Sequence, residues 1–464
     1  MMTVLGIVVL GFLAIWLLVS YFRPPLAFVL MIVLYPLKQV EQTYLPFFVT
    51  NSALFNIIVG FCVLAAALGS ISRNRRAIAD MWGPFTATLV LLFLFAVASL
   101  VWSPSQKEAI GILSAGLPYW LMQVLLIPII FATARDYRST LGPTLLIASI
   151  VAVLFLTNPL GVFVNARYVL KLGSGYDNDF GNPLASAQMG GQMAFIAALT
   201  IARKTSLPWL LARIAALVLG LALAVEAGSR GQLLASVFLI VTMYPVARKV
   251  RDIKQFFLTA AGFGLMVSIA YLTIVVILSG DHGESSRWDL TLASEHTSER
   301  TREILLLMNW WWERPQNWVF GLGANAFTSI PGVGQGYVHN AVVELLCEYG
   351  FFGLGTFCAL AFMTFRHSRE LFRRHSEDPE LRSAVAVLIA FGLYSFLLSL
   401  KQGAFLGSPE PYCFWLLIVK INCSERYAEQ SYQAQLAEHE AYYAGGALPG
   451  YEDVAAAYSN TGNA

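Results

Sequence analysis

Long stretches without a charged residue constrain this chain more than any other feature of its sequence. Four of them lie at 2–21, 52–68, 85–101 and 256–278. Each approaches the roughly 20 apolar residues that an α-helix needs to cross the hydrocarbon core of a bilayer. Helices satisfy their backbone polar groups internally, as lipid demands, whereas barrel strands would alternate in polarity over about 10 residues. The stretches therefore predict an all-α polytopic membrane protein.

The composition supports one integral membrane domain. Of the 464 residues, 57% are hydrophobic and 12% are charged. Soluble domains carry about 25% charged residues, so this chain has too few to cover a water-facing surface. The net charge of +2 gives no reason to expect nucleic acid as a partner. The first apolar segment lacks a basic start and a small-residue cleavage site, so we expect a span and not a removable signal peptide.

We predict about 12 transmembrane helices from thirteen apolar segments, and whether 25–38 and 411–422 cross the membrane is left open. The segments are 2–22, 25–38, 51–71, 84–102, 117–134, 141–157, 184–202, 207–226, 231–248, 256–279, 340–366, 383–401 and 411–422.

Basic residues mark alternate connections, which the positive-inside rule assigns to the cytoplasm. They are Arg73, Arg75 and Arg76; Arg135 and Arg138; Arg203 and Lys204; Arg248, Lys249, Arg251 and Lys254; and Arg366, Arg369, Arg373, Arg374 and Arg382. The opposite side then receives the loops 158–183, 226–231 and 279–339.

The loop 279–339 is far longer than the roughly 15 residues beyond which loops are usually functional or disordered. It is rich in Trp, Arg and Glu, and its sequence predicts a helix over 299–312, so we favour function. The predicted organisation is a transmembrane domain over 1–422, with this periplasmic loop and its short helices inserted, and a cytoplasmic, partly disordered tail over 423–464.

Arg230 lies between two predicted spans on the side where basic residues should be scarce. Gly228 and Gly231 are expected to permit a tight turn around it. Ser229 and Gln232 are hydrogen-bonding neighbours.

The pair Arg300 and Arg302 begins the predicted loop helix, with Ser298 as its expected N-cap. A helix N-terminus is itself a site that favours anions. These two arginines are therefore the second basic group on the outer side.

His339 stands where the long loop returns to the membrane, beside Tyr337 and Asn340. A histidine titrates near neutrality and can accept a proton from a hydroxyl group. Asn340 is placed to orient the imidazole or a sugar. Glu344 and Glu348 follow on the same helix, where they either face the site or form hydrogen bonds inside the bundle.

An arginine near lipid costs roughly 2.5 to 3.5 kcal/mol at the bilayer centre, and less near the interface. A diphosphate offsets that cost well, because guanidinium presents a planar fork of donors to phosphate oxygens. A lipid headgroup, or a carboxylate such as Glu226, is the alternative partner for any one of these arginines. For the three basic groups together we favour the diphosphate.

No metal or cofactor is expected. The five cysteines show no zinc-ligand spacing, and the nearest carboxylate cluster in an outer loop is Asp177-Asn178-Asp179. Trp310, Trp311, Trp312 and Trp318 fit an interfacial belt that anchors the loop helix, and stacking on sugar rings is the alternative.

Several of these segments resemble the signatures of the O-antigen ligase and O-antigen polymerase family. The resemblance covers roughly residues 85 to 400, and its order and spacing are specific although each piece is short. The matching segments are Leu100–Pro104, Gly181–Ala185, Gly228–Gly231, Arg300 with the following Arg314-Pro315 and Gly321–Asn325, and the His339-Asn340 pair before a span with a glycine-containing break between Gly350 and Gly353.

This resemblance implies a GT-C-like membrane glycosyltransferase in the bacterial inner membrane, with its active site facing the periplasm. Its donor would be a glycan on undecaprenyl diphosphate, and its acceptor a sugar hydroxyl of lipid A-core or of another lipid-linked glycan. His339 would be the base, and Arg230, Arg300 and Arg302 would bind the diphosphate. Ser229, Tyr337 and Asn340 would support them.

Ligase and polymerase share these segments. A single outer loop that carries the arginines and the histidine favours a ligase, whereas a polymerase should have a second basic outer loop, for which 158–183 with Arg167 and Lys171 is a candidate. The rival from another class is a transporter of a lipid-linked saccharide. That reading predicts ionisable residues near the midplane and broken helices in repeated halves.

Overall fold

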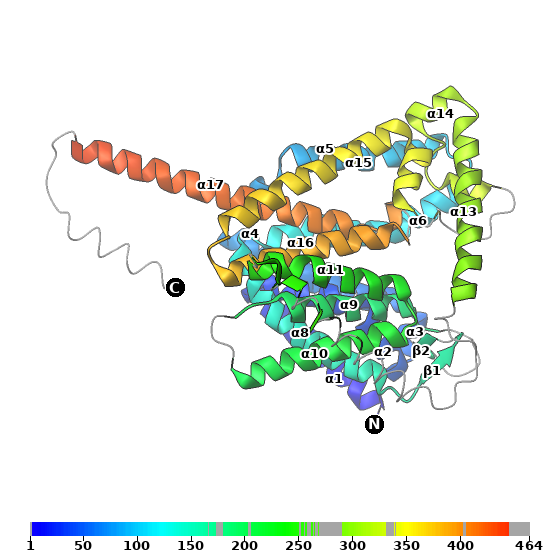
Figure 1. Cartoon of the computed structure of the whole chain (residues 1–464), viewed down its shortest axis with the longest axis horizontal. Helices are drawn as coiled ribbons and strands as arrows, with labels where there is room; N and C mark the ends of the chain where they lie inside the picture. The colour runs from blue at the N-terminus through cyan, green and yellow to red at the C-terminus, as the bar shows by residue number, and fades with distance from the viewer. Residues whose placement is uncertain are drawn as a thin grey trace. The chain divides into compact units, whose positions relative to one another are not determined.

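The computed structural model describes residues 2–444 except 166, 173–179, 203–205, 250–251, 255, 258–260, 263, 265–267, 269–289, 331–337, 339 and 402–404. The chain divides into two compact units, Met1–Asn422 and Cys423–Ala464. The first unit is a bundle of helices, and the described part of the second is helical (Figure 1).

The helices account for most of the described residues, and their bounds in chain order are as follows. They are α1 (Met2–Phe22), α2 (Ala27–Tyr44), α3 (Phe47–Thr50), α4 (Ser52–Arg73), α5 (Pro84–Ala98), α6 (Gln106–Tyr119), α7 (Ile127–Ile130), α8 (Ala134–Leu156), α9 (Pro183–Leu199), α10 (Leu207–Glu226), α11 (Arg230–Arg248), α13 (Leu290–Trp312), α14 (Pro315–Phe320), α15 (Ala341–Arg374), α16 (Pro379–Ser399) and α17 (Glu410–Ala444). Short helical turns are η1 (Pro24–Leu26), η2 (Ala79–Met81), η3 (Ser99–Val101), η4 (Trp120–Leu126), η5 (Ala326–Ser329) and η6 (Phe405–Gly407).

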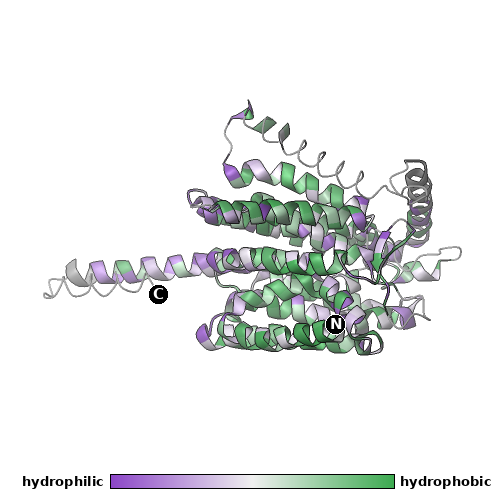
Figure 2. Cartoon of the chain, turned by 90° about the horizontal axis from the view of Figure 1, so that it is seen from below, coloured by the Kyte–Doolittle hydropathy of each residue, from purple (hydrophilic) through white to green (hydrophobic). Residues whose placement is uncertain are grey.

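Within the described residues, 10 helices are long and apolar enough to cross a membrane, which confirms a multi-pass membrane protein of the all-α class. They are Val4–Phe22, Pro24–Tyr44, Ser52–Arg73, Pro84–Val101, Gln106–Ile130, Ala134–Leu156, Leu207–Glu226, Arg230–Arg248, Ala341–Arg374 and Pro379–Ser399. Apolar residues run along these helices, and hydrophilic residues gather toward their ends (Figure 2).

Three predicted spans are not among these ten. The span predicted at 184–202 is the buried helix α9, which has 17 residues. The segment 411–422 forms the buried start of α17, which continues as one helix to Ala444. The span predicted at 256–279 falls largely outside the described residues. Of the tail 423–464, which we predict to be partly disordered, 423–444 are helical and 445–464 lie outside the described residues.

Two predicted spans begin later in the sequence than the helices that the structure shows. The helical run predicted at 117–134 starts at Gln106 and passes through Pro118 into the π-helical turn η4, which accommodates the proline. Helix α8 starts at Ala134 and not at 141, because Thr133 and Asp136 form a capping box there. Arg135 therefore lies in the first turn of a helix and not in a loop.

The helix predicted at 299–312 in the outer loop is α13, and it begins earlier, at Leu290. Leu, Ala and Glu among residues 290–298 favour helix, so the chain is already helical before Ser298. The prediction of Ser298 as an N-cap is wrong, and Arg300 lies within the helix and not at its start.

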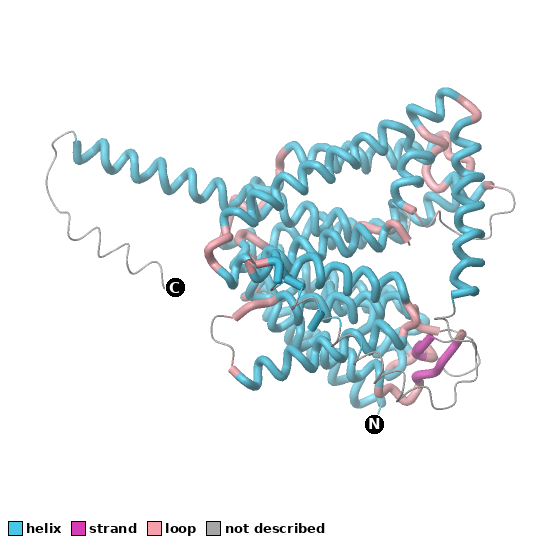
Figure 3. The backbone as a smooth tube through the Cα atoms, in the orientation of Figure 1, coloured by secondary structure: helices cyan, strands magenta, loops and turns pink. Residues whose placement is uncertain are grey.

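A small β-hairpin adds to the helical architecture in the outer loop predicted at 158–183. Strand β1 (Gly161–Val164) pairs antiparallel with β2 (Arg167–Leu170), and Gly161 lies opposite Leu170. The hairpin lies at the same end of the bundle as α13 and α14 (Figures 1 and 3).

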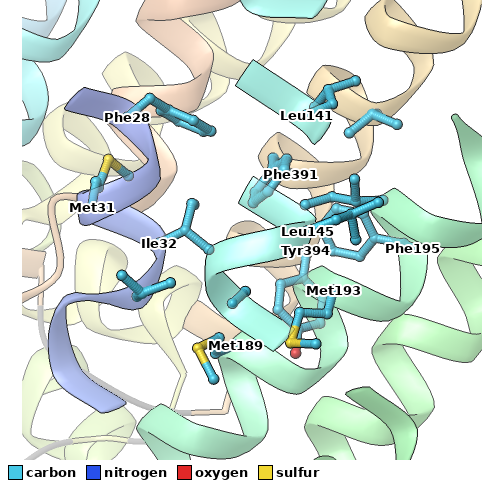
Figure 4. Packing of buried hydrophobic residues seen from close by; sticks show 14 of the residues in the cluster. Phe28, Met31, Ile32, Leu141, Leu145, Met189, Met193, Phe195, Phe391 and Tyr394 are labelled. Carbon is cyan, nitrogen blue, oxygen red and sulfur yellow. The ribbon is translucent and has the colours of Figure 1, made fainter. Parts of the chain in front are cut away.

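The core of the bundle is built from aromatic rings and small residues. Phe28 of α2 contacts Phe391 of α16 edge-on, with ring centroids 5.9 Å apart, and Phe195 of α9 lies 4.8 Å from Phe391 (Figure 4). Where α9 crosses α10, a Cβ on Gly190 would stand 2.4 Å from the carbonyl oxygen of Gly220. Such small residues let helix backbones approach closely in lipid, where apolar burial alone does not drive association.

Candidate functional site

The outer turn between α10 and α11 places Arg230 at the first position of α11. Gly228 adopts φ +61°, a left-handed conformation that glycine takes at no steric cost, and this confirms its predicted part in the turn. Gly231, in contrast, lies inside the helix, so its predicted role in the turn is wrong. The buried Ser229 occupies the N-cap position of α11.

Lys401, which the sequence analysis did not single out, lies against this turn. Its Nζ is 3.5 Å from Ser229 Oγ. A Cβ added at Gly231 would stand 2.6 Å from Lys401 Cδ and 2.8 Å from Nζ, so the glycine makes room for this side chain. Lys401 follows α16 on the outer side, and the positive-inside rule should have marked it as unusual there.

Two buried glutamines bind the segment Gly181–Ala185, and one of them, Gln232, connects it to this turn. Gln232 Nε2 donates to the carbonyl of Leu184 at 2.8 Å, and Gln39 Nε2 of α2 donates to that of Asn182 at 3.1 Å. The Oε1 atoms of both glutamines are buried and have no hydrogen-bond partner among the described residues. The first group of the site therefore consists of the α11 turn, Lys401 and the start of α9.

A second group forms where the segment Leu100–Pro104 meets the segment Gly321–Asn325. Ser103 Oγ donates to the carbonyl of Ala324 at 2.6 Å, and the amide of Ala324 donates to Ser99 Oγ at 3.0 Å. Gly323 has φ +97°, and a Cβ there would stand 2.6 Å from Ser103 Cα. Two segments that are far apart in the sequence are thus in direct contact.

Glu348 and Glu344 fasten outer loops to the start of α15. The Glu348 carboxylate accepts hydrogen bonds from the amides of Asn325 (2.7 Å) and Phe327 (3.2 Å). Glu344 Oε1 accepts from the amide of Phe405 at 2.7 Å, in the connection that follows Lys401. Of the two readings open from sequence, these contacts support hydrogen bonding inside the bundle. They also connect the second group to the turn at Phe405 through α15.

Asn340 is the N-cap of α15, and Gly350 interrupts that helix. The Asn340 side chain accepts from the amides of Val342 and Val343 at 3.1 and 3.2 Å. Gly350 has φ +67°, and a Cβ there would stand 2.2 Å from the carbonyl oxygen of Val319 at the end of α14. The predicted glycine-containing break is therefore present.

Arg300 and Arg302 are carried by α13, which packs on the second group through buried Leu307 and Trp311 in a cluster with Phe327. His339 and Tyr337 lie outside the described residues, as do Asp177 and Asp179. The predicted roles of His339 and Tyr337 remain predictions. Among the residues that the structure describes, no group of three His, Cys, Asp or Glu side chains could hold a metal ion.

The β-hairpin is fastened to the end of α8 by Tyr168. Its hydroxyl donates to the carbonyls of Phe155 (3.2 Å) and Leu156 (3.1 Å). Burial raises the pKa of Tyr168, and the nearby carboxylate of Glu226 raises it further. The phenol therefore stays protonated at neutral pH and keeps its role as donor.

At the end of the bundle opposite the α11 turn, three buried cations bind carbonyls where helices end. Arg213 donates twice to Ala197 in the last turn of α9, at 2.6 and 3.0 Å. Arg382 donates to Ala247 in the last turn of α11 at 3.0 Å, and Lys420 donates to Phe131 at the end of α7. Cations stabilise helix C-termini through these bonds and through the helix dipole. These charges are structural.

The fold defines the chain as a multi-pass α-helical membrane protein. No protein-family model matches it, and no curated protein matches its sequence. Its function must therefore be argued from the residues of the outer site.

Proposed function

We propose that the protein is a membrane glycosyltransferase that transfers a glycan from undecaprenyl diphosphate to a sugar hydroxyl, without a metal, at the periplasmic face of the bacterial inner membrane. The reaction we favour is ligation of O-antigen to lipid A-core. The observation that carries the proposal is the position of Arg230 and Lys401 at the N-terminus of α11.

The electrostatics of this turn favour a multiply charged anion. A helix N-terminus carries about half a positive elementary charge, and its first amides point outward as donors. Arg230 and Lys401 add two cations at the same place. A diphosphate complements all of these groups, because its oxygens accept from helix amides, from the lysine ammonium and, in pairs, from guanidinium.

The same groups suit the chemistry of glycan transfer. The acceptor hydroxyl attacks the anomeric carbon of the donor, the bond from that carbon to the diphosphate oxygen breaks, and undecaprenyl diphosphate leaves with the electron pair. The acceptor proton passes to His339. Arg230 and Lys401 stabilise the negative charge on the leaving group, which a soluble transferase achieves with a metal ion. Arg300 and Arg302 supply further positive charge from α13.

In its finer detail the proposal includes a GT-C-like arrangement of about 12 transmembrane helices. Helix α9, the apolar start of α17 and the predicted span 256–279 are the candidates beyond the ten that length and composition identify.

Polymerisation of lipid-linked repeat units is the second candidate, and the β-hairpin is the observation in its favour. Arg167 lies on β2, and Lys171 follows that strand in a bridge to Phe180. They give the outer face a second basic segment. Transport of a lipid-linked saccharide has less support, because the buried cations Arg213, Arg382 and Lys420 bind helix-terminal carbonyls and do not line a pathway.

The test uses purified protein in lipid nanodiscs with an undecaprenyl-diphosphate oligosaccharide and EDTA, with and without lipid A-core. Glycan products of the wild type and of His339→Ala are compared on gels. A product that requires both lipid A-core and His339 is the expected result for the ligase. A ladder without lipid A-core would identify a polymerase. Absence of product with folded protein and substrates that a known enzyme accepts would overturn the transferase.

A further inference from the structure

A cavity of about 870 Å³ lies at the outer end of the bundle, beside α14 and apart from the residues of the α11 turn. It is formed by the end of α5 and the residues that follow it, by the C-terminal end of α13, and by α14 with the start of the next loop. The lining residues are Phe95, Ala98, Trp102, Pro104, Trp310, Glu313, Arg314, Gln316, Asn317, Phe320, Gly321 and Leu322. Its volume lies in the range of small-molecule binding sites, roughly 300 to 1,000 Å³.

The lining combines two kinds of chemistry. Trp102 and Trp310 present indole rings from different elements, with Phe95 and Phe320 also in the wall. The side chains of Glu313, Arg314, Gln316 and Asn317 supply acceptors and donors. A sugar ring has the matching surface, because its C–H faces are apolar and its rim carries hydroxyl groups that both donate and accept.

The walls are held in place by the backbone contacts of the second group. The amides of Leu322 and Gly323 donate to the carbonyls of Cys347 and Glu348, each at 2.9 Å. Gly321 has φ +75°, and a Cβ there would stand 2.2 Å from the carbonyl carbon of Glu348. A cavity with walls fixed in this way loses little entropy when a ligand binds, so affinity for a weakly held sugar is retained.

The cavity also lies at the right depth for a lipid-linked ligand. Its α5 residues belong to the last part of the span Pro84–Val101, and Trp102 follows directly, with 41% of its surface exposed. Tryptophan is enriched at the level of lipid headgroups. A saccharide bound there can remain attached to its lipid in the bilayer.

From this geometry we infer that the cavity is a saccharide-binding subsite that holds sugar rings of a membrane-anchored glycolipid, with Trp102 and Trp310 as stacking surfaces. The inference rests on the proposed function only for the glycolipid's role as a transferase substrate. The chemistry is shared by the acceptor and by the donor glycan, so the experiment distinguishes the two.

The experiment measures glycolipid retention by nanodisc-embedded protein with native mass spectrometry. The probes are lipid A-core, lipid A without core sugars, an undecaprenyl-diphosphate oligosaccharide and phosphatidylglycerol. We expect Trp102→Ala and Trp310→Ala each to weaken retention of one of the saccharide-bearing lipids at least about tenfold, as expected when a central tryptophan contact is lost. The phenylalanine variants should restore most of it. The probe that responds identifies acceptor or donor.

Trp312→Ala is the matched control, because Trp312 is 63% exposed, packs against Trp318 in a tilted arrangement with ring centroids 4.8 Å apart, and is not part of the cavity lining. It should retain glycolipid like the wild type. Equal retention by all variants would overturn the subsite. Equal retention of lipid A without core sugars and of phosphatidylglycerol would overturn it as well. Tryptophan-dependent retention by a protein that makes no product would instead leave the subsite standing and overturn the transferase. Loss of transfer in Arg230→Ala with retention unchanged would show that the two sites are separate.

Discussion

The two ends of the helix bundle use positive charge in opposite ways. At the end opposite the α11 turn, Arg213, Arg382 and Lys420 bind carbonyls at helix C-termini, where the helix dipole is negative. At the outer end, Arg230 and Lys401 stand at the N-terminus of α11, where the dipole is positive. The first arrangement stabilises the folded protein by itself. The second is stabilised most when an anion binds there.

This difference separates cations that lie at helix C-termini from cations that we propose to bind a diphosphate at a helix N-terminus. A cation near a helix terminus is worth about 0.3 to 1 kcal/mol, stabilising at the C-terminus and destabilising at the N-terminus. The following predictions test that separation.

The largest effect is expected for Arg230→Ala. Glycan transfer should fall about 100- to 1,000-fold, the loss typical when one preorganised charge-stabilising group is removed. Thermal unfolding in nanodiscs should change little, because loss of a cation at a helix N-terminus does not remove a favourable dipole interaction. Arg230→Lys should recover part of the transfer. A drop in Tm large enough to account for the loss of activity would assign Arg230 a structural role. The two ends of the bundle would then no longer differ in how they use positive charge.

The opposite pattern is expected for Arg382→Ala. Arg382 donates to Ala247 at 3.0 Å and to Ser376 at 2.6 Å, so its loss leaves buried carbonyls without their donor. The free energy of unfolding should fall by about 1 to 3 kcal/mol, while the folded fraction keeps its activity. Denaturant titration in mixed micelles measures this change. The exposed Arg369 is the control, and Arg369→Ala should unfold like the wild type. Equal stability of the two variants would contradict the structural role of Arg382.

A smaller effect is expected for Lys401→Ala, whose transfer rate should fall about tenfold, close to 1.4 kcal/mol of transition-state stabilisation. Lys401→Arg should retain most of the rate. Gly231→Ala should lower the rate by less, because its new Cβ would displace only the flexible end of the Lys401 side chain. Kinetics with varied donor concentration measure both variants. A lower transfer rate for Gly231→Ala than for Lys401→Ala would mean that Gly231 has a role other than making room for the Lys401 side chain.

Hydropathy was sufficient to predict the membrane class, because apolar length is a property of local sequence. The starts at Gln106 and Ala134 were missed, because a helix that continues through Pro118 and a capping box at Thr133 are not visible in the hydropathy pattern. The N-cap expected at Ser298 failed for a related reason, since serine is tolerated inside a helix whose neighbours favour it.

The candidate site was predictable in part. Arg230 and the turn at Gly228 followed from the sequence, because charge on the outer side and a nearby glycine are local features. Lys401 was not identified although the positive-inside rule marks it as unusual, and its relation to Gly231 depends on the packing of α16 against α11. The hydrogen bonds from Glu344 and Glu348 to distant loops likewise required the folded structure.

The break at Gly350 has a mechanical consequence. The regular hydrogen bonding of the helix is interrupted there. The two pieces of α15 are therefore not held in line by the helix itself. The outer piece, with Asn340 at its tip, is instead bound to the loop through Glu348. The outer piece therefore takes its direction from the loop to which it is bound, and that loop, more than the rest of α15, sets the position of Asn340.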